Sequence, residues 1–153
     1  MGLAKIVSGG QTGVDRGALD AALELGFPCG GWCPPGRVAE DGPIDRRYPL
    51  VEMAKGGYEE RTRQNVLDSD GTVVLHFGVL EGGTALTVEL CELEQRPCKV
   101  IDASEVSPEQ AAEIVASFVH EHAISTLNVA GPRESKIPRA RTYAHAVITR
   151  VIA

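Results

Sequence analysis

The sequence lacks the features that mark several large functional classes. Its longest apolar stretches run to about seven residues, far short of the roughly 20 that span a membrane, and its first residues do not have the charged and then apolar layout of a secretory signal. It has 15 lysine and arginine residues against 21 aspartate and glutamate residues, a net charge of −6. Because nucleic acids and anionic membranes attract clustered positive charge, we expect a cytoplasmic protein that binds neither.

Cysteines and metal-binding patterns are also scarce. Cys29, Cys33, Cys91 and Cys98 have spacings that match no usual zinc site, and we expect a cytoplasmic chain to keep these thiols reduced. No directly coordinated metal is therefore predicted. The 153 residues, 43% apolar and 24% charged, are typical of one globular domain that covers residues 1–153.

The chain does contain a regular alternation of apolar strands and amphipathic helices. Strands are predicted at 3–8, 27–32, 72–78, 99–102 and 126–130, with a helix after each. The segment TVVLHFG at 72–78 is apolar almost throughout, which is typical of a strand covered by helices on both faces. This alternation predicts a three-layer α/β fold with a mostly parallel five-stranded sheet.

Two segments between the strands have local patterns of their own. Ser107, Pro108, Glu109 and Gln110 predict a capping box with proline in the first helical turn, and the last helix is expected to start near Pro138. Residues 33–49, CPPGRVAEDGPIDRRYP, have no periodicity and predict a long loop. Long loops in compact domains are usually functional.

Glycines cluster at the ends of four of the five predicted strands. They are Gly9, Gly10 and Gly13 after the first, Gly30 and Gly31 in the second, Gly78, Gly82 and Gly83 after the third, and Gly131 after the fifth. The carboxyl ends of parallel strands meet at one edge, where open α/β sheets bind ligands. Glycine turns expose backbone N–H groups and helix N-termini attract anions. Because G-x-G-x-x-G and G-K-[ST] are absent, a phosphate site is predicted without standard NAD or ATP chemistry.

Polar residues beside these turns extend the predicted site. Gln11, Thr12 and Thr84 lie within the turns. Arg133 and Ser135 in AGPRESK would clamp an anion, unless they belong to a solvated loop.

Further residues have a functional and a structural interpretation that the sequence leaves open. Asp15 and Arg16 begin a helix, where Asp15 would at least offset the helix dipole. Arg61, Arg63 and Asn65 lie on a polar helix, and one arginine is expected to be solvated. Glu89 is a catalytic candidate or an exposed glutamate. His76, within an apolar strand, is predicted to be a hydrogen-bonded core histidine.

Five segments resemble a known family. They are SGGQTGVDRGALDAAL, GGWCPPGRVAEDG, YEERTRQNVLDSDGT, GVLEGGTALTVEL and NVAGPRESK. In this order they resemble the family named "putative molybdenum carrier proteins", part of the SLOG superfamily of Rossmann-like nucleotide-binding domains. The resemblance implies a homo-oligomer, a dimer or tetramer, that binds a phosphate-bearing ligand, namely molybdenum cofactor or a nucleotide. The metal would be held through its pterin, with Trp32 as an apolar wall.

A more distant resemblance concerns the lysine-decarboxylase-like phosphoribohydrolases of the same superfamily. Their opening strand and turn match NVAGPRES, and their next glycine turn matches SGGQTG, so the chain resembles a circular permutation of them. A consecutive chain would have the strand order 2-1-3-4-5. The permutation implies 2-1-5-3-4 instead, with the two termini close together.

The same resemblance implies a competing activity. The enzymes carry P-G-G-x-G-T-x-x-E, and Gly82, Gly83 and Glu89 fall on matching offsets, with Arg61 or Arg63 matching an upstream arginine. Glu81 replaces the proline and Ala85-Leu86 the Gly-Thr pair. A carrier without enzymatic activity is favoured. The alternatives are a nucleotide N-glycosidic hydrolase, with Glu89 as general acid or base and Arg61 orienting the phosphate, and a nucleotide-sensing module.

Overall fold

Five parallel strands form the central sheet of the computed structural model, which describes residues 2–153. They are β1 (Lys5–Val7), β2 (Cys29–Gly30), β7 (Gly71–His76), β8 (Cys98–Asp102) and β9 (Thr126–Ala130). Their spatial order is β2-β1-β9-β7-β8, and all neighbouring pairs are parallel. Counted along the chain this is 2-1-5-3-4, so the predicted permuted order is confirmed.

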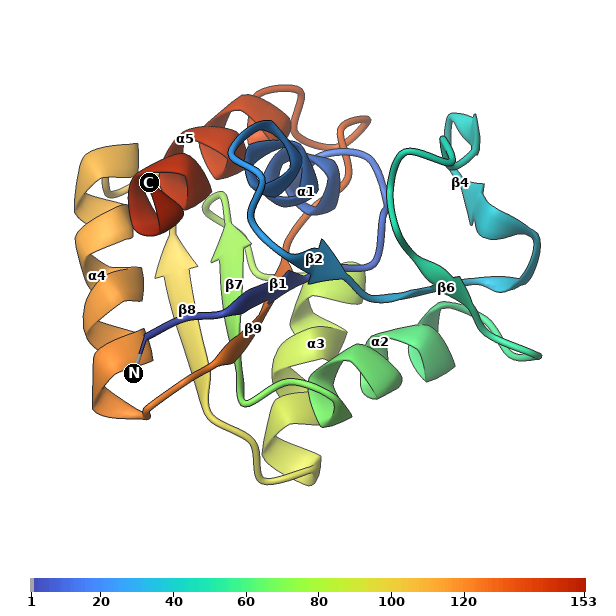
Figure 1. Cartoon of the computed structure of the whole chain (residues 1–153), viewed down its shortest axis with the longest axis horizontal. Helices are drawn as coiled ribbons and strands as arrows, with labels where there is room; N and C mark the ends of the chain where they lie inside the picture. The colour runs from blue at the N-terminus through green and yellow to red at the C-terminus, as the bar shows by residue number, and fades with distance from the viewer. Residues whose placement is uncertain (1) are drawn as a thin grey trace.

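Helices cover both faces of this sheet (Figure 1). The helices on one face are α1 (Val14–Glu24), α4 (Pro108–Glu121) and α5 (Ala140–Ile152), and those on the other are α2 (Tyr58–Leu67) and α3 (Gly82–Leu93). Val73 and Leu75 of β7 are fully buried in the core beneath the first group. Because side chains alternate along a strand, Thr72 and Val74 face the second group.

The last two helices, α4 and α5, begin in different ways. Ser107 Oγ accepts a hydrogen bond from Gln110 N–H at 3.2 Å, and Gln110 Oε1 accepts one from Ser107 N–H at 2.9 Å. The predicted capping box is therefore confirmed. The final helix begins at Ala140 rather than near Pro138.

The predicted second strand is split in two. β2 lies in the main sheet, whereas β3 (Trp32–Cys33) pairs in parallel with β6 (Val51–Glu52) in a separate small sheet. Gly31 separates them at φ +135, and a Cβ there would lie 3.0 Å from Ser8 N. Only glycine fits this close approach, so the chain leaves the main sheet at this residue.

The segment 33–49 contains more structure than the predicted loop. It forms a 3-10 turn η1 (Pro35–Arg37) and an antiparallel hairpin of β4 (Val38–Ala39) and β5 (Gly42–Pro43). The Arg37 guanidinium donates hydrogen bonds to three backbone carbonyl oxygens of the segment and to that of Leu50, which follows it. A small core also forms beneath it from Leu19, Cys33, Ala39, Ile44, Tyr48 and Leu50.

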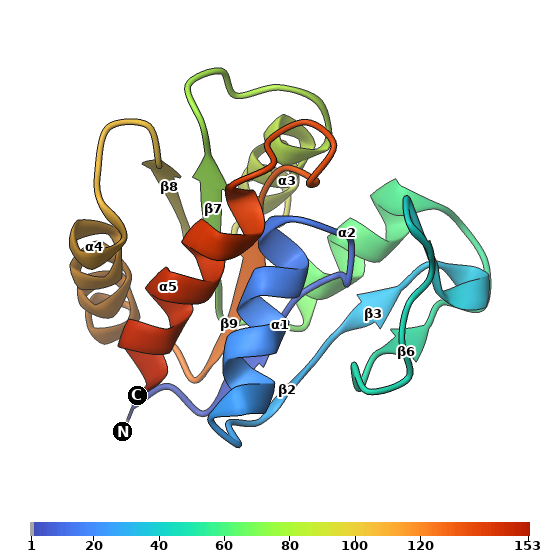
Figure 2. The ribbon, with the colours of Figure 1, turned by 90° about the horizontal axis from the view of Figure 1, so that it is seen from above.

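The two termini lie close together at one end of the molecule (Figure 2). In Figure 1 the C-terminal helix α5 ends in the layer of helices above the sheet. Leu3, Val151 and Ile152 pack against the same core. All four cysteines are free thiols, as predicted. None of the helices formed by residues 2–153 has the length and apolar composition that a membrane crossing needs.

Candidate functional site

A cavity of about 600 Å³ opens at the carboxyl edge of the sheet. It lies on the face covered by α2 and α3, and strand residues Asn128 and His76 contribute to its wall. The predicted site residues that line it are Gly9, Gln11, Asp15, Arg61, Asn65, Gly83, Thr84, Gly131 and Arg133. Its size is typical of small-molecule sites.

Arg61 is the most buried cation of the cavity, with only 7% of its surface exposed. Its Nη1 donates a hydrogen bond of 2.6 Å to the carbonyl oxygen of Gly9. A guanidinium has five N–H donors, and no ion pair of residues 2–153 includes Arg61. Arg63 instead lies at the surface, with its Nε 3.8 Å from Glu94 Oε2.

Asp15 lines the cavity beside Arg61 and is 7% exposed. Its Oδ2 accepts a hydrogen bond from Gln11 N–H at 3.2 Å. Burial raises the pKa of this carboxyl above its ordinary value, against the lowering effects of the Arg61 charge and the Gln11 N–H. Asp15 is thus a cavity acid whose neutral form is favoured more than that of an exposed aspartate.

The turn after β1 packs directly against the turn after β9. Val14 N–H donates to the Pro132 carbonyl oxygen at 3.2 Å. A Cβ at Gly13, where φ is +83, would lie 2.9 Å from the Arg133 carbonyl carbon. Gly13 therefore does not line the cavity but allows the two turns to meet.

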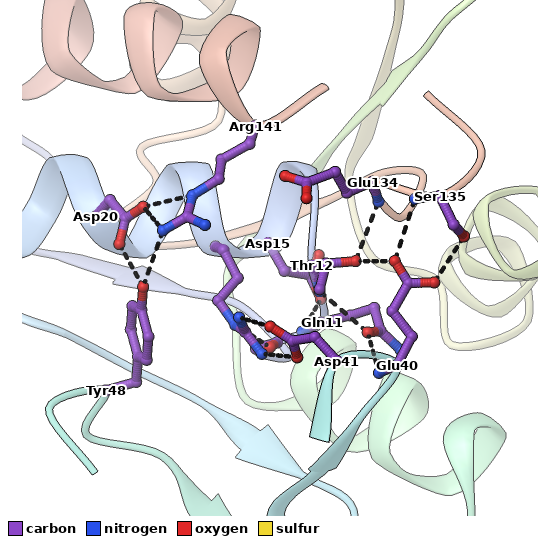
Figure 3. Close-up of polar contacts among 12 residues, drawn as sticks. Gln11, Thr12, Asp15, Asp20, Glu40, Asp41, Tyr48, Glu134, Ser135 and Arg141 are labelled. Atoms are coloured by element: carbon purple, nitrogen blue, oxygen red, sulfur yellow. Dashed lines mark hydrogen bonds and ion pairs between the residues drawn. The ribbon is translucent and has the colours of Figure 1, made fainter. Parts of the chain in front are cut away.

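Thr12 and Ser135, both predicted to hold phosphate, instead bind Glu40 from the segment 33–49 (Figure 3). Glu40 Oε2 accepts hydrogen bonds from Thr12 Oγ1 and from Ser135 N–H, the latter at 3.1 Å, and Oε1 accepts one from Ser135 Oγ at 2.6 Å. The Ser135 hydroxyl and then the Thr12 hydroxyl lower the pKa of the Glu40 carboxyl. Neither Thr12 nor Ser135 lines the cavity.

Other predicted residues also hold this segment. Arg16 donates to both oxygens of Asp41, at 2.8 and 2.9 Å, and to the Gly10 carbonyl oxygen at 2.8 Å. Asn65 accepts from Trp32 N–H at 2.8 Å and donates to the Trp32 carbonyl oxygen at 3.0 Å. Arg16, Trp32 and Gly10 do not line the cavity, so the apolar wall expected from Trp32 is supplied by other side chains.

Two predicted residues on α3 lie outside the cavity as well. Glu89 is exposed, and Thr87, two residues nearer the start of the same helix, lines the cavity instead. Gly82 begins the helix beside Lys136, whose Nζ would be 3.2 Å from a Cβ at that position. Of the two interpretations of Glu89, the exposed glutamate therefore agrees with its position, which is not at the cavity.

Several cavity residues were missed by sequence reasoning: Tyr58, Thr62, Phe77, Leu86, Asn128, Lys136 and Ile137. The Tyr58 ring has Arg61 Cζ 5.3 Å and Arg133 Cζ 5.7 Å from its centroid, a cation–π arrangement. His76 Nδ1 is buried without a hydrogen-bond partner, so the predicted hydrogen-bonded core histidine is wrong for this atom. The position of His76 and Phe77 at the end of β7 was the available signal.

This arrangement of strands and turns matches a described family. The family model "Circularly permutated YpsA SLOG family" matches residues 6–152. The chain belongs to this family. It is also similar to a crystal structure at 1.45 Å resolution from Syntrophus aciditrophicus SB, a protein named "putative molybdenum carrier protein". The identity is 44%, the similarity covers 99% of this chain and 96% of that one, and the TM-score is 0.96. No curated protein matches the chain.

The permutation of the SLOG family has a direct effect on the cavity. β9 lies between β1 and β7, so the turn at 131–136 stands between the turn at 8–13 and the start of α3.

Among residues 2–153, no group of three or more His, Cys, Asp and Glu side chains is arranged to hold a metal ion.

Proposed function

We propose that this protein binds a phosphate-bearing small molecule in the cavity at the carboxyl edge of the sheet and acts as its carrier. Arg61 carries the proposal. Its guanidinium is always charged, it is almost withdrawn from water, and the Gly9 carbonyl oxygen satisfies only part of its donor capacity. Burying a charge is unfavourable unless it is paired, and an anionic ligand group would supply the partner.

The cavity lining supports a ligand with a heterocyclic ring. Phe77, Leu86 and Ile137 offer apolar contacts, while His76 at the end of β7 and Asn128 in the middle of β9 offer polar atoms. Such a mixture fixes the orientation of a flat, polar ring. Molybdenum cofactor, with a pterin and a phosphate, and a nucleotide both have these parts. The name of the crystal-structure relative favours the first; the molybdenum would then be held through its pterin.

The test is to identify by mass spectrometry what the native protein retains on purification. Arg61→Ala is expected to lose the retained molecule. Arg63→Ala is the matched control, because it removes the same charge from the same helix but at the surface, beside Glu94. Equal retention by wild type and Arg61→Ala would contradict the proposal, as would a retained molecule without phosphate or another anionic group.

Hydrolysis of a nucleotide N-glycosidic bond is a second candidate, and Asp15 is the observation that favours it. A buried carboxyl with a raised pKa is suited to donate a proton to a leaving base. We propose Asp15, rather than the exposed Glu89, as the acid of such an activity, with Arg61 orienting the phosphate. Wild-type protein should then release free base from a nucleoside monophosphate and Asp15→Asn should not. Base release that is lost in Glu89→Gln but kept in Asp15→Asn would contradict this assignment.

We also propose that the protein is a homo-oligomer. Val79 is 69% exposed and Leu93 is 70% exposed, and both belong to α3 or the loop before it. Because these two side chains lie at opposite ends of α3 and exposed apolar residues mark an interface only as a contiguous patch, we base this proposal on the family resemblance of the sequence. Light scattering coupled to gel filtration should give a dimer or tetramer mass, and a monomer mass would contradict the proposal.

A further inference from the structure

The Glu40 carboxylate receives a dense set of donors just outside the cavity (Figure 3). Thr12 Oγ1 donates to Oε2, Ser135 donates through its N–H and its hydroxyl, and Arg133 Nη1 lies 3.9 Å from Oε1. Thr12 Oγ1 also accepts a hydrogen bond from Glu134 N–H at 3.0 Å, which leaves its own hydrogen for Glu40. Three hydrogen-bond donors and a cation therefore converge on one carboxylate.

These donors are of the kind that binds phosphate and carboxylate groups in general: hydroxyls, a turn N–H and a guanidinium. The carboxylate of Glu40 stands where the oxygens of such a group would be. The donor set is continuous with the cavity, because Gln11 and Arg133 line the cavity and also interact with Glu40. Gln11 Oε1 accepts a hydrogen bond from Glu40 N–H at 2.9 Å.

We infer that Thr12, Ser135 and Arg133 form an anion subsite adjoining the cavity, filled by the Glu40 carboxylate in the free protein and taken over by an anionic group of the ligand. This inference rests on the proposed function. Glu40 is then a tethered competitor of the ligand. Asp41 fastens the same hairpin to Arg16 independently, so the Glu40 side chain can leave while the hairpin stays in place.

The direction in which Glu40→Gln changes the affinity for inorganic phosphate distinguishes this role from a purely structural one. Glu40→Gln keeps the length of the side chain but removes its charge. It should bind inorganic phosphate more tightly than wild type. The gain in affinity is the reciprocal of the fraction of wild-type molecules in which the donors are free, so a free fraction of about a tenth would give a gain of about tenfold. If Glu40 only holds the hairpin, Glu40→Gln binds phosphate with equal or lower affinity, which overturns the inference.

Asp41→Asn is the matched control for charge. It removes one negative charge from the adjacent residue, which faces Arg16 rather than Thr12 and Ser135. Its affinity for inorganic phosphate in calorimetry should stay close to wild type, and a gain equal to that of Glu40→Gln overturns the inference. The gain of Glu40→Gln should disappear when Ser135→Ala is added.

A second measurement uses the wild-type protein, so it does not depend on whether the variants fold. On titration with inorganic phosphate, the carbon-13 resonance of the Glu40 carboxylate should move toward the value of a free glutamate. A resonance that stays unchanged at saturation overturns the inference. If only the subsite inference is wrong, Arg61→Ala still loses the retained ligand. If the proposed function is wrong, Arg61→Ala retains as much as wild type.

Discussion

Gly9→Ala should weaken ligand binding because the new methyl group displaces the Arg61 guanidinium. A methyl group at Gly9 would overlap the Arg61 guanidinium, with Cβ 2.8 Å from Cζ and 3.0 Å from Asp15 Oδ2. Arg61 is a side chain and can move away, but it then loses its 2.6 Å hydrogen bond to the Gly9 carbonyl oxygen. The variant should therefore bind ligand as poorly as Arg61→Ala does.

The expected change in stability follows from two opposing effects. A hydrogen bond to a charged group contributes about 1.5–3 kcal/mol. Replacing glycine by alanine where φ is not positive stabilises by about 0.4–1 kcal/mol through the unfolded chain. The loss dominates, so Gly9→Ala should lower the free energy of unfolding by about 1–2 kcal/mol.

A double-mutant cycle in urea denaturation tests this account. In the Arg61→Ala background the guanidinium is absent, so adding Gly9→Ala should be neutral or stabilising, apart from any share due to Asp15. The two substitutions should thus show a coupling energy of about 1.5–3 kcal/mol. An equal cost of Gly9→Ala in both backgrounds would refute the reasoning, because the methyl would then clash with something other than Arg61.

Two further predictions concern stability. Burial raises the pKa of Asp15, so its contribution is fully present below the unfolded pKa and is lost as pH rises through the folded value. In urea denaturation, Asp15→Asn should therefore gain stability relative to wild type as the pH rises above about 4, the ordinary pKa of an aspartate, and a difference independent of pH would contradict this. In Gly17→Ala the new Cβ, between α1 and α5, clashes with the Arg141 carbonyl oxygen and lies 3.1 Å from Ala144 Cβ. Overpacking of about 1–3 kcal/mol exceeds the helix-propensity gain of about 1 kcal/mol, so the melting temperature should fall, unlike that of Gly83→Ala, whose Cβ has open space.

The sequence was informative where a pattern has one structural solution. The capping box at Ser107 and the apolar run of β7 are local patterns, and both were predicted correctly. The strand order required the family resemblance, because alternation alone also fits the consecutive order. Local propensity says nothing about which strands become neighbours.

The choice between Arg61 and Arg63 shows where such reasoning ends. Residues two apart on a helix point about 200° apart, so one arginine must face away from whatever the helix covers. Residues four apart share a face, and the buried Asn65 lies on the side of Arg61. The sequence alone did not say which face of this polar helix is covered.

The role of Glu40 could not be predicted from the sequence for a different reason. It lies in a segment without periodicity, and its partners Thr12 and Ser135 are far from it along the chain. Such contacts depend on tertiary packing of three turns and leave no local pattern. Thr12 and Ser135 could be recognised as anion-binding residue types, but not as partners of an internal carboxylate.

The place of β9 in the sheet also bears on synthesis. β9 is the last strand of the chain to be made, and it pairs with both β1 and β7. Until it emerges from the ribosome, the pairs β2-β1 and β7-β8 have no strand to join them, and the turn carrying Arg133 does not exist. Because domains fold as units during translation, the cavity cannot be complete until β9 and the turn at 131–136 have been synthesised.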